Sequence, residues 1–555
     1  MNGAEVAAAE EQRWNRFDAG AIAIAAVIAA VALMQSWNRW FDPIVDAGRD
    51  LYISERIVHG ATLYRDIRYQ YPPLTPYLLA GIVRVFGSSL RMFTLVGIAQ
   101  SLAVGALLLV TARRVAGRWA ALAIVVMFFS MNFTGATTFG SNFVIPYSYA
   151  ATIGMVFLLL FFAAAAGRED RPAAEGLRSA VAVAAALIAS WCKVEYAIAV
   201  VITMAVLVAA KRFRIRDAVG FVMAAVLTMA AALLYFGGTR WLWDDVLSAS
   251  LTRGAAAQHF FATVAGTASW PARLGDVGVG CVAIAAIVVL LRIRSFRWIA
   301  LGIAIVVGVG IPINSFFRAW GLLQWIALVW ALLRDRRDLL LPLAVFSIAS
   351  TLRIPLNVAP WWYGFVLVVP AYLLIVYVLF SYLPARGVYA RNAAAVWLAV
   401  FALFGWRSMV DQRLRYSVKA FPVTTIRGTF YDANDGRAAV LREFLPRVEG
   451  ATLAVMPEGI GLNYLAGAPT TLTYYTFIPP ETADPRVEQA IISELERRPP
   501  QHIALVRRSV AEFGYRGFGI DYDRRLTGWI RAHYSMEKTW SEPRFELVLL
   551  RRNPT

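Results

Sequence analysis

The stretch FDPIVDAGRDLYISERIVHGATLYRDIRYQYPPLTP, residues 41–76, interrupts a chain that otherwise runs from one apolar segment to the next. It places carboxylates, arginines and tyrosines in close succession. A connection between two membrane helices is usually short and carries little chemistry. This long, charged and aromatic stretch therefore indicates a working surface, and the apolar segments around it decide the fold.

The composition around this stretch is that of a membrane protein. Hydrophobic residues make up 59% of the 555 residues, charged residues only 16%, and the mean hydropathy is +0.57. A soluble domain carries about 25% charged residues. Apolar segments of roughly 17–22 residues recur along the chain and predict about 13 transmembrane helices. These segments lie near 19–36, 92–112, 119–134, 144–166, 177–191, 196–210, 218–236, 275–291, 298–312, 316–333, 339–350, 361–382 and 393–409.

The net charge of +18 would suggest nucleic acid as a partner in a soluble protein. Here the excess lies mostly in short loops, where basic residues set membrane topology and meet anionic lipid headgroups, so we expect no nucleic-acid partner. Alternate loops carry basic clusters, such as Arg113, Arg114 and Arg118. The positive-inside rule then places the N-terminus in the cytoplasm, with the loop at 37–91 and residues 411–555 outside. The short apolar segment 74–87 is predicted to be an interfacial or re-entrant helix.

Beyond residue 410 the composition changes to that of a soluble domain. Three short apolar runs predict buried strands, and the segments between them predict helices. The strands are expected at 451–457, 502–508 and 545–551, and the helices at 439–445, 485–497 and 522–533. We therefore predict two parts: a membrane domain over 1–410 and an outer, partly parallel α/β domain over 411–555. The turn at 457–467 lacks the glycine pattern of a nucleotide site.

The sequence gives little support for a metal-binding site with cysteine or histidine ligands. Cys192 and Cys281 lie in or beside apolar segments without a second cysteine nearby, and the four histidines form no cluster. A divalent cation (Mg²⁺, Mn²⁺ or Zn²⁺) held by carboxylates stays open.

Asp46 is the strongest candidate for a catalytic group. It follows the first apolar segment closely, and a helical reading puts Asp46, Arg49 and Asp50 on one face. A carboxylate at the edge of a membrane cavity can act as a general base toward a hydroxyl group or bind a divalent cation. The simpler alternative is a solvated interfacial helix whose carboxylates pair with its arginines.

These residues carry a resemblance to a known superfamily. Asp46 with Arg49, then GATLYRD at 60–66 and YPPL at 71–74, followed by many spans and an outer soluble domain, resemble the GT-C membrane glycosyltransferases. The likeness is to bacterial relatives of protein O-mannosyltransferases and of the lipid A aminoarabinose transferase. It is strongest over 1–120 and only architectural over 120–410. It implies that Asp46 is the catalytic base; Ala47 replaces the second acid of many mannosyltransferases, which leaves the acceptor class and an acidic-pair metal site open.

Sugar transfer outside the cytoplasmic membrane has no supply of nucleotide sugars, so the donor would be a sugar on a polyprenyl phosphate. Its phosphate needs positive charge where negative charge develops. Outer loops offer Lys193, next to Glu195, together with Arg318 and Arg353. Each has a simpler interpretation, as a snorkelling side chain or an interfacial anchor.

Further candidates would line the acceptor side or the rim of the cavity. They are Asp50, Tyr64, Asp66, Tyr71, Glu195, Arg253 and His259. The prolines of YPPL fix an extended turn that would place Tyr71 at the rim. The alternative for the tyrosines is an aromatic belt at the interface, and Arg253 and His259 belong to a long outer segment that would act as a lid.

The sequence therefore favours an inverting glycosyltransferase of the bacterial cytoplasmic membrane that uses a polyprenyl-phosphate sugar and acts on a lipid, glycan or protein hydroxyl. Asp46 would deprotonate the acceptor opposite the leaving phosphate. Two alternatives remain: a transporter or flippase for a lipid-linked saccharide, although no repeated halves are visible, and a non-catalytic membrane assembly protein.

Overall fold

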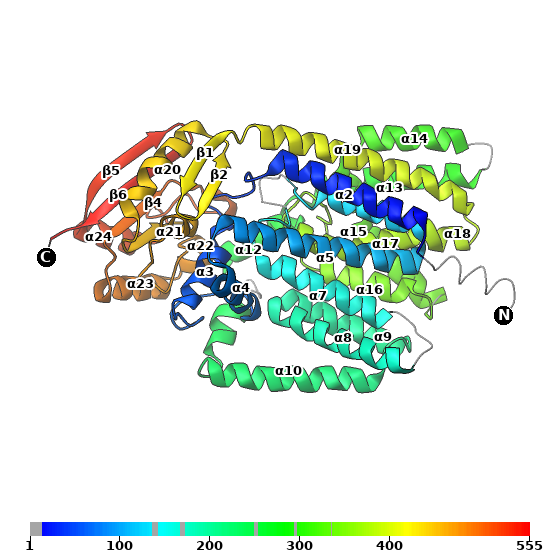
Figure 1. Cartoon of the computed structure of the whole chain (residues 1–555), viewed down its shortest axis with the longest axis horizontal. Helices are drawn as coiled ribbons and strands as arrows, with labels where there is room; N and C mark the ends of the chain where they lie inside the picture. Colours follow the sequence, from blue (N-terminus) through cyan, green and yellow to red (C-terminus); the bar gives the residue numbers. More distant parts are fainter. Residues whose placement is uncertain are drawn as a thin grey trace.

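Apolar helices form a bundle that fills one half of the molecule in the computed structural model (Figure 1). The structure describes residues 14–135, 142–166, 172–248, 254–293, 297–334 and 336–554. Within these ranges nine helices are long and apolar enough to cross a membrane, and five shorter apolar helices accompany them. The chain is thus a multi-pass membrane protein.

Each of the predicted apolar segments corresponds to a helix. Of the five shorter apolar helices, four match predicted spans. The other is α4 (Leu74–Phe86), which the sequence analysis predicted as an interfacial or re-entrant segment. The bundle consists of α2 (Arg16–Ser36), α5 (Leu90–Ala116), α6 (Arg118–Met131), α7 (Tyr149–Ala166), α8 (Pro172–Cys192), α9 (Val194–Ala209), α10 (Ile215–Tyr235), α13 (Trp270–Arg292), α14 (Arg297–Gly310), α15 (Ile313–Arg334), α16 (Leu340–Thr351), α17 (Val369–Tyr377) and α19 (Ala395–Ser417).

The strands of the described chain all follow α19. A four-stranded sheet has the order β3-β4-β6-β5, in which β3 and β4 are parallel and the other neighbours antiparallel; β1 and β2 form a separate hairpin. The strands are β1 (Phe421–Thr425), β2 (Gly428–Asp432), β3 (Leu453–Met456), β4 (His502–Val506), β5 (Tyr534–Glu542) and β6 (Phe545–Arg552). The helices around them are α20 (Asp435–Val448), α21 (Ile460–Ala466), α22 (Pro479–Thr482), α23 (Pro485–Arg497) and α24 (Arg524–His533).

The partly parallel α/β architecture predicted for this part is confirmed, with β3, β4 and β6 at the three apolar runs. The sequence analysis missed β5 because it is an edge strand with a largely exposed, polar sequence, so it carries no apolar run. It also missed the β1–β2 hairpin. The division of the chain at residues 410 and 411 stays a prediction, since α19 continues through that point to Ser417.

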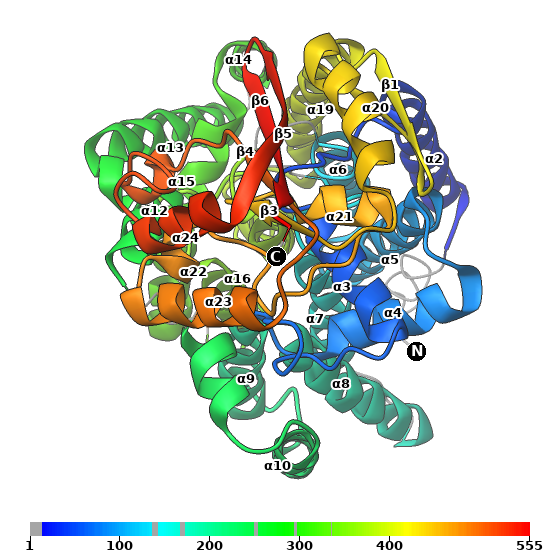
Figure 2. The same ribbon diagram turned by 90° about the vertical axis from the view of Figure 1, so that its left-hand side faces the viewer.

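The first loop, predicted at 37–91, lies between the bundle and the sheet (Figure 1). It contains α3 (Gly48–Val58) and α4 (Leu74–Phe86); in the end-on view α3 lies behind the C-terminal elements and α4 lies beside them (Figure 2). A Cβ on Gly48 would lie 2.2 Å from the Cα of Gly461, so α3 and α21 approach backbone to backbone. The Glu55–Arg427 ion pair joins the two parts at a second point. The C-terminal part is therefore docked directly on the loop.

Candidate functional site

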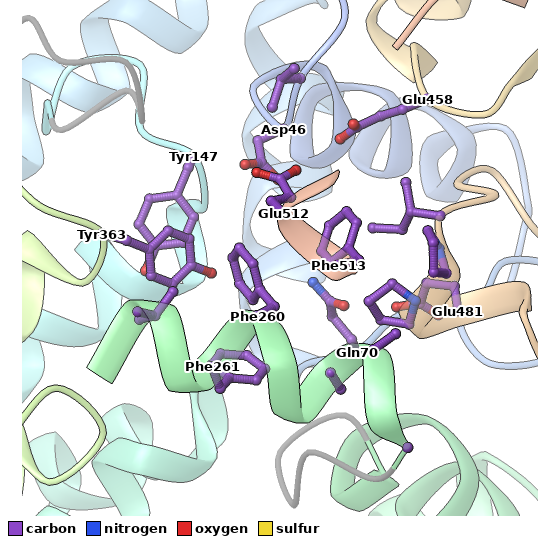
Figure 3. Close-up of a pocket in the computed structure, with 18 of the residues that line it drawn as sticks. Asp46, Gln70, Tyr147, Phe260, Phe261, Tyr363, Glu458, Glu481, Glu512 and Phe513 are labelled. Atoms are coloured by element: carbon purple, nitrogen blue, oxygen red, sulfur yellow. The ribbon is translucent and has the colours of Figure 1, made fainter. Parts of the chain in front are cut away.

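A cavity of about 1180 Å³ opens where the bundle, the first loop and the C-terminal part meet. The short helix α12 (Ala255–Ala265) forms one wall and carries Phe260 into it, as Figure 3 shows. Of the residues predicted from the sequence, the structure brings five to its lining: Asp46, Tyr71, Lys193, Glu195 and Arg353.

Local backbone geometry directs Asp46 into this cavity. The Asp42 carboxylate accepts hydrogen bonds from the amides of Ile44 (2.9 Å) and Val45 (3.1 Å), which folds the chain into a turn after the first span. Asp46 follows in the left-handed region, at φ +53°, directly before α3. A residue other than glycine held there stores strain, and such strain is concentrated at functional sites. Its side chain is 39% exposed, although the cavity walls surround it.

Arg49 and Asp50 anchor α3 to the segment before α7. The buried guanidinium of Arg49 donates to the main-chain oxygen of Tyr147 (3.0 Å) and lies 3.8 Å from the Asp46 carboxylate. The Asp50 carboxylate accepts from the amide of Tyr149 (2.6 Å). Arg49 lines a small side pocket next to Asp46 and not the main cavity. These two residues are therefore placed to position Asp46.

A cationic cluster lines another part of the same cavity. Lys193, the residue before α9, lies 3.5 Å from Glu195, and Arg353 forms an ion pair with the same carboxylate. The Lys193 ammonium is 5.3 Å from the ring centroid of Tyr71, and the Arg353 guanidinium lies 3.8 Å above the ring of Phe261. Two cations share one carboxylate, which leaves a net positive charge facing the cavity. This arrangement suits a phosphate group.

Arg318 lies elsewhere. It belongs to α15, where its buried guanidinium binds Asp276 at 2.5 Å and the side-chain oxygen of Asn357 at 3.1 Å. The structure does not bring it to the cavity lining. Arg253 lies outside the described residues.

The remaining predicted residues surround the site without lining the cavity. The Tyr64 hydroxyl donates to the main-chain oxygen of Tyr71 (2.7 Å), which fixes the end of the loop. The Asp66 carboxylate accepts from the amide of Thr62 (2.8 Å) within its own turn. His259 lies exposed on α12. Tyr64 therefore acts on the position of Tyr71 rather than on a ligand in the cavity.

The sequence analysis missed the contribution of the C-terminal part. Arg508 binds Glu458 and Glu512, each at 2.6 Å, and all three side chains line the cavity. Figure 3 shows Glu458 and Glu512 near Asp46. Glu458 follows β3 and Arg508 follows β4, and these strands are parallel neighbours. Ligands bind where the carboxyl ends of parallel strands meet. If the apolar runs at 451–457 and 502–508 are assumed to pair as parallel strands, the residues at their carboxyl ends become candidates. These residues include Glu458 and Arg508.

The carboxylates around Asp46 influence one another. Burial raises the pKa of Asp46 above its usual value, and the nearby Asp50 and Glu512 raise it further, against the opposing charges of Arg49 and Arg508. Burial likewise raises the pKa of Glu458 to about 7, even though Arg508 binds it. A carboxyl with a raised pKa is suited to proton transfer near neutral pH. Among the described residues, no three His, Cys, Asp or Glu side chains form a metal-binding group.

The fold and the cavity define a class: a multi-pass membrane protein with a small α/β part docked on its first loop. Neither a protein-family model nor a curated protein sequence matches the chain. The solved structures that it resembles include ArnT from Cupriavidus metallidurans bound to undecaprenyl phosphate, with a TM-score of 0.50 and 13% identity over 95% of this chain and 97% of that one. This likeness confirms the predicted GT-C resemblance at the level of the fold.

Two further structures are similar. ArnT from the same organism in the apo state gives a TM-score of 0.45 at 14% identity, covering 96% of this chain and 98% of that one. The apo oligosaccharyltransferase of Archaeoglobus fulgidus gives 0.47 at 13% identity, covering 87% of this chain and 69% of that one.

Proposed function

We propose that this protein is an inverting glycosyltransferase that moves a sugar from a polyprenyl-phosphate donor to a hydroxyl group of a lipid, glycan or protein. The observation that carries the proposal is that Asp46 shares one cavity with Lys193 and Arg353. A base and a phosphate-binding pair in a single cavity are what this transfer requires. The GT-C fold supports the same activity, and one structure with this fold, ArnT, was solved with undecaprenyl phosphate.

The chemistry assigns one role to each part of the cavity. The acceptor hydroxyl transfers its proton to the Asp46 carboxylate while its oxygen attacks the anomeric carbon. The bond from that carbon to the phosphate oxygen breaks, and polyprenyl phosphate leaves with the bonding electrons. Attack from the face opposite the phosphate inverts the anomeric centre. Because phosphate is a good leaving group, cations serve better here than a general acid.

Lys193 and Arg353 would hold the donor phosphate. The negative charge on that group increases as the glycosidic bond breaks, and the net positive charge of their cluster stabilises the increase. Glu195 orients both cations through its two ion pairs. The exposed apolar side chains of the surrounding helices contact lipid, so the polyprenyl chain would enter the cavity from the bilayer.

The proposed orientation follows from the loop charges. The first loop and residues 411–555 lie on the outer face of the bacterial cytoplasmic membrane, with the N-terminus in the cytoplasm. Polyprenyl-phosphate sugars can reach a cavity on the outer face of the membrane, whereas nucleotide sugars are made in the cytoplasm. Membrane lipids surround the bundle, and the acceptor would enter beneath the C-terminal part.

The test uses the purified protein in lipid nanodiscs with polyprenyl-phosphate sugars, and mass spectrometry to detect released polyprenyl phosphate. Asp46→Asn removes the base and should lower turnover by at least about 100-fold. Asp411→Asn is the matched control: Asp411 is also 39% exposed, but it pairs with Arg415 on α19 and does not line the cavity.

A folded Asp46→Asn variant with wild-type turnover would contradict the proposal. Absence of any donor cleavage by the wild type would contradict it too. A flippase moves its lipid without breaking a bond, so it releases no polyprenyl phosphate from a nanodisc.

A further inference from the structure

The two ends of the cavity carry opposite charge. One end has the net positive cluster of Lys193, Glu195 and Arg353. The other end lies beneath the C-terminal part, where Glu458, Glu481 and Glu512 join Asp46. Figure 3 shows these carboxylates on the side away from Tyr147 and Tyr363.

The cations at the acidic end already have partners. Arg68 binds Asp245 at 3.0 Å, and Arg486 binds Asp484 at 3.0 Å. The Lys419 ammonium donates to a main-chain oxygen at 2.7 Å. Arg508 lies between two glutamates, as described above. Glu481, in contrast, forms no ion pair within the described part of the chain. This end therefore retains an excess of negative charge.

A side pocket of about 90 Å³ extends the acidic end behind Asp46 and Glu481. Its wall contains Tyr69, which is 1% exposed and whose hydroxyl has no hydrogen-bond partner in the described residues. The Gln70 amide, oriented to satisfy both neighbours, donates to Glu481 (3.1 Å) and accepts from Arg49 (3.0 Å). A buried hydroxyl without a partner costs free energy unless a ligand or water satisfies it. The pocket therefore brings the carboxylates of Asp46 and Glu481 together with the polar side chains of Gln70 and Arg49.

An aromatic surface extends from this end toward Tyr363. The rings of Phe260 on α12 and Phe513 in the C-terminal part lie 5.3 Å apart between centroids, and both line the cavity. Phe260 also meets the edge of Tyr363, at 5.4 Å. Flat aromatic surface beside carboxylates fits a sugar ring, whose C–H face packs on the rings while its hydroxyl groups donate to the carboxylates.

We infer that the acidic end is the acceptor subsite and that it selects a saccharide without an anionic group, either neutral or amine-bearing. This inference rests on the proposed function and names its acceptor class. The hydroxyl groups of such an acceptor donate to Glu481 and Glu512. One hydroxyl faces Asp46, which removes its proton. A phosphate or uronate on the acceptor would meet the negative charge of these carboxylates at short range, where repulsion is weakly screened.

The experiment compares three matched alkyl glycosides as acceptors in the nanodisc assay: one neutral, one with an amino group, and one with a phosphate monoester at a position that does not react. The wild type should use the first two at least about tenfold better than the third, by kcat/KM. The double variant Glu481→Gln/Glu512→Gln should narrow this ratio, chiefly by improved use of the phosphorylated glycoside. Glu496→Gln, a surface change on α23, is the control and should preserve the ratio.

Three results would overturn the inference: equal or preferred use of the phosphorylated glycoside, an unchanged ratio in the double variant, or no use of any of the three. Cleavage of the donor with water as acceptor is measured in parallel. If that cleavage depends on Asp46, the proposed function stands even when the inference fails. If it does not, the proposed function itself is wrong.

Discussion

Arg318 and Arg353 look alike in the sequence, since each follows an apolar segment in a loop predicted to lie on the outer side of the membrane, but the structure places them differently. Arg353 lines the cavity and shares Glu195 with Lys193. Arg318 lies within α15, where Asp276 and Asn357 satisfy its guanidinium. Loop charge identifies the side of the membrane on which an arginine lies. Only the lateral packing of the helices decides whether it meets the site or supports the bundle.

The largest predicted difference between Arg353 and Arg318 is in their effect on catalysis. Lys193→Gln and Arg353→Gln should each lower kcat for donor cleavage by about 100-fold, because each removes a cation from the leaving phosphate. Arg318→Gln should leave kcat of the folded protein within about threefold. It should instead cost about 2 kcal/mol of stability, since it removes the donor to the buried side-chain oxygen of Asn357 and leaves Asp276 with Arg273 as its remaining ion-pair partner. Steady-state kinetics and thermal unfolding in nanodiscs measure both quantities. A loss of turnover in Arg318→Gln with an unchanged melting temperature would contradict the claim that Arg318 supports the helix bundle rather than the site.

A smaller effect concerns the docking of the C-terminal part on α3. Gly48→Ala should lower stability by about 1–3 kcal/mol, because the new Cβ meets backbone atoms of Gly461 that cannot rotate away. Gly20→Ala is the control: no atom lies within 4 Å of its Cβ, and alanine favours the helix α2. Thermal unfolding compares the two variants. Equal stability would show that α3 and α21 are not in backbone contact.

The pH dependence of donor cleavage tests the carboxylates around Asp46. Asp46 must be ionised to accept a proton, so activity should fall as the pH drops through its pKa, which lies above the usual range for aspartate. Arg508 lowers the pKa of Asp46, so Arg508→Gln should move this acid limb to higher pH by about one unit. Glu458→Gln removes an interacting carboxylate and should move the limb in the opposite direction. Identical pH profiles of the wild type and the two variants would show that neither Arg508 nor Glu458 affects the pKa of Asp46.

The smallest expected effect is at the rim of the loop. Asp66→Asn should change donor cleavage by less than about threefold, because the Asp66 carboxylate binds its own turn and an exposed arginine. The same kinetic assay measures it. A loss comparable with that of Lys193→Gln would place Asp66 in the site after all.

The sequence predicted those features that depend on local pattern. The apolar segments, the three buried strands and the long polar loop with Asp46 can each be read from a single window of residues. Glu458 and Arg508 could not be found this way, because their proximity depends on the parallel pairing of β3 with β4. The anchoring role of Asp50 was equally hidden, since its partner, the amide of Tyr149, lies far along the chain.

Photo-crosslinking tests most directly the claim that a lipid-linked sugar reacts in the cavity of Asp46. The probe is a polyprenyl-phosphate sugar with a diazirine on the isoprene unit next to the phosphate, and mass spectrometry maps the labelled peptides. We expect labelling around Lys193, Tyr147 and Arg353, reduced by an excess of unlabelled donor. Labelling confined to α13 and α15 around Arg318, or spread evenly over the lipid-facing helices, would contradict the account.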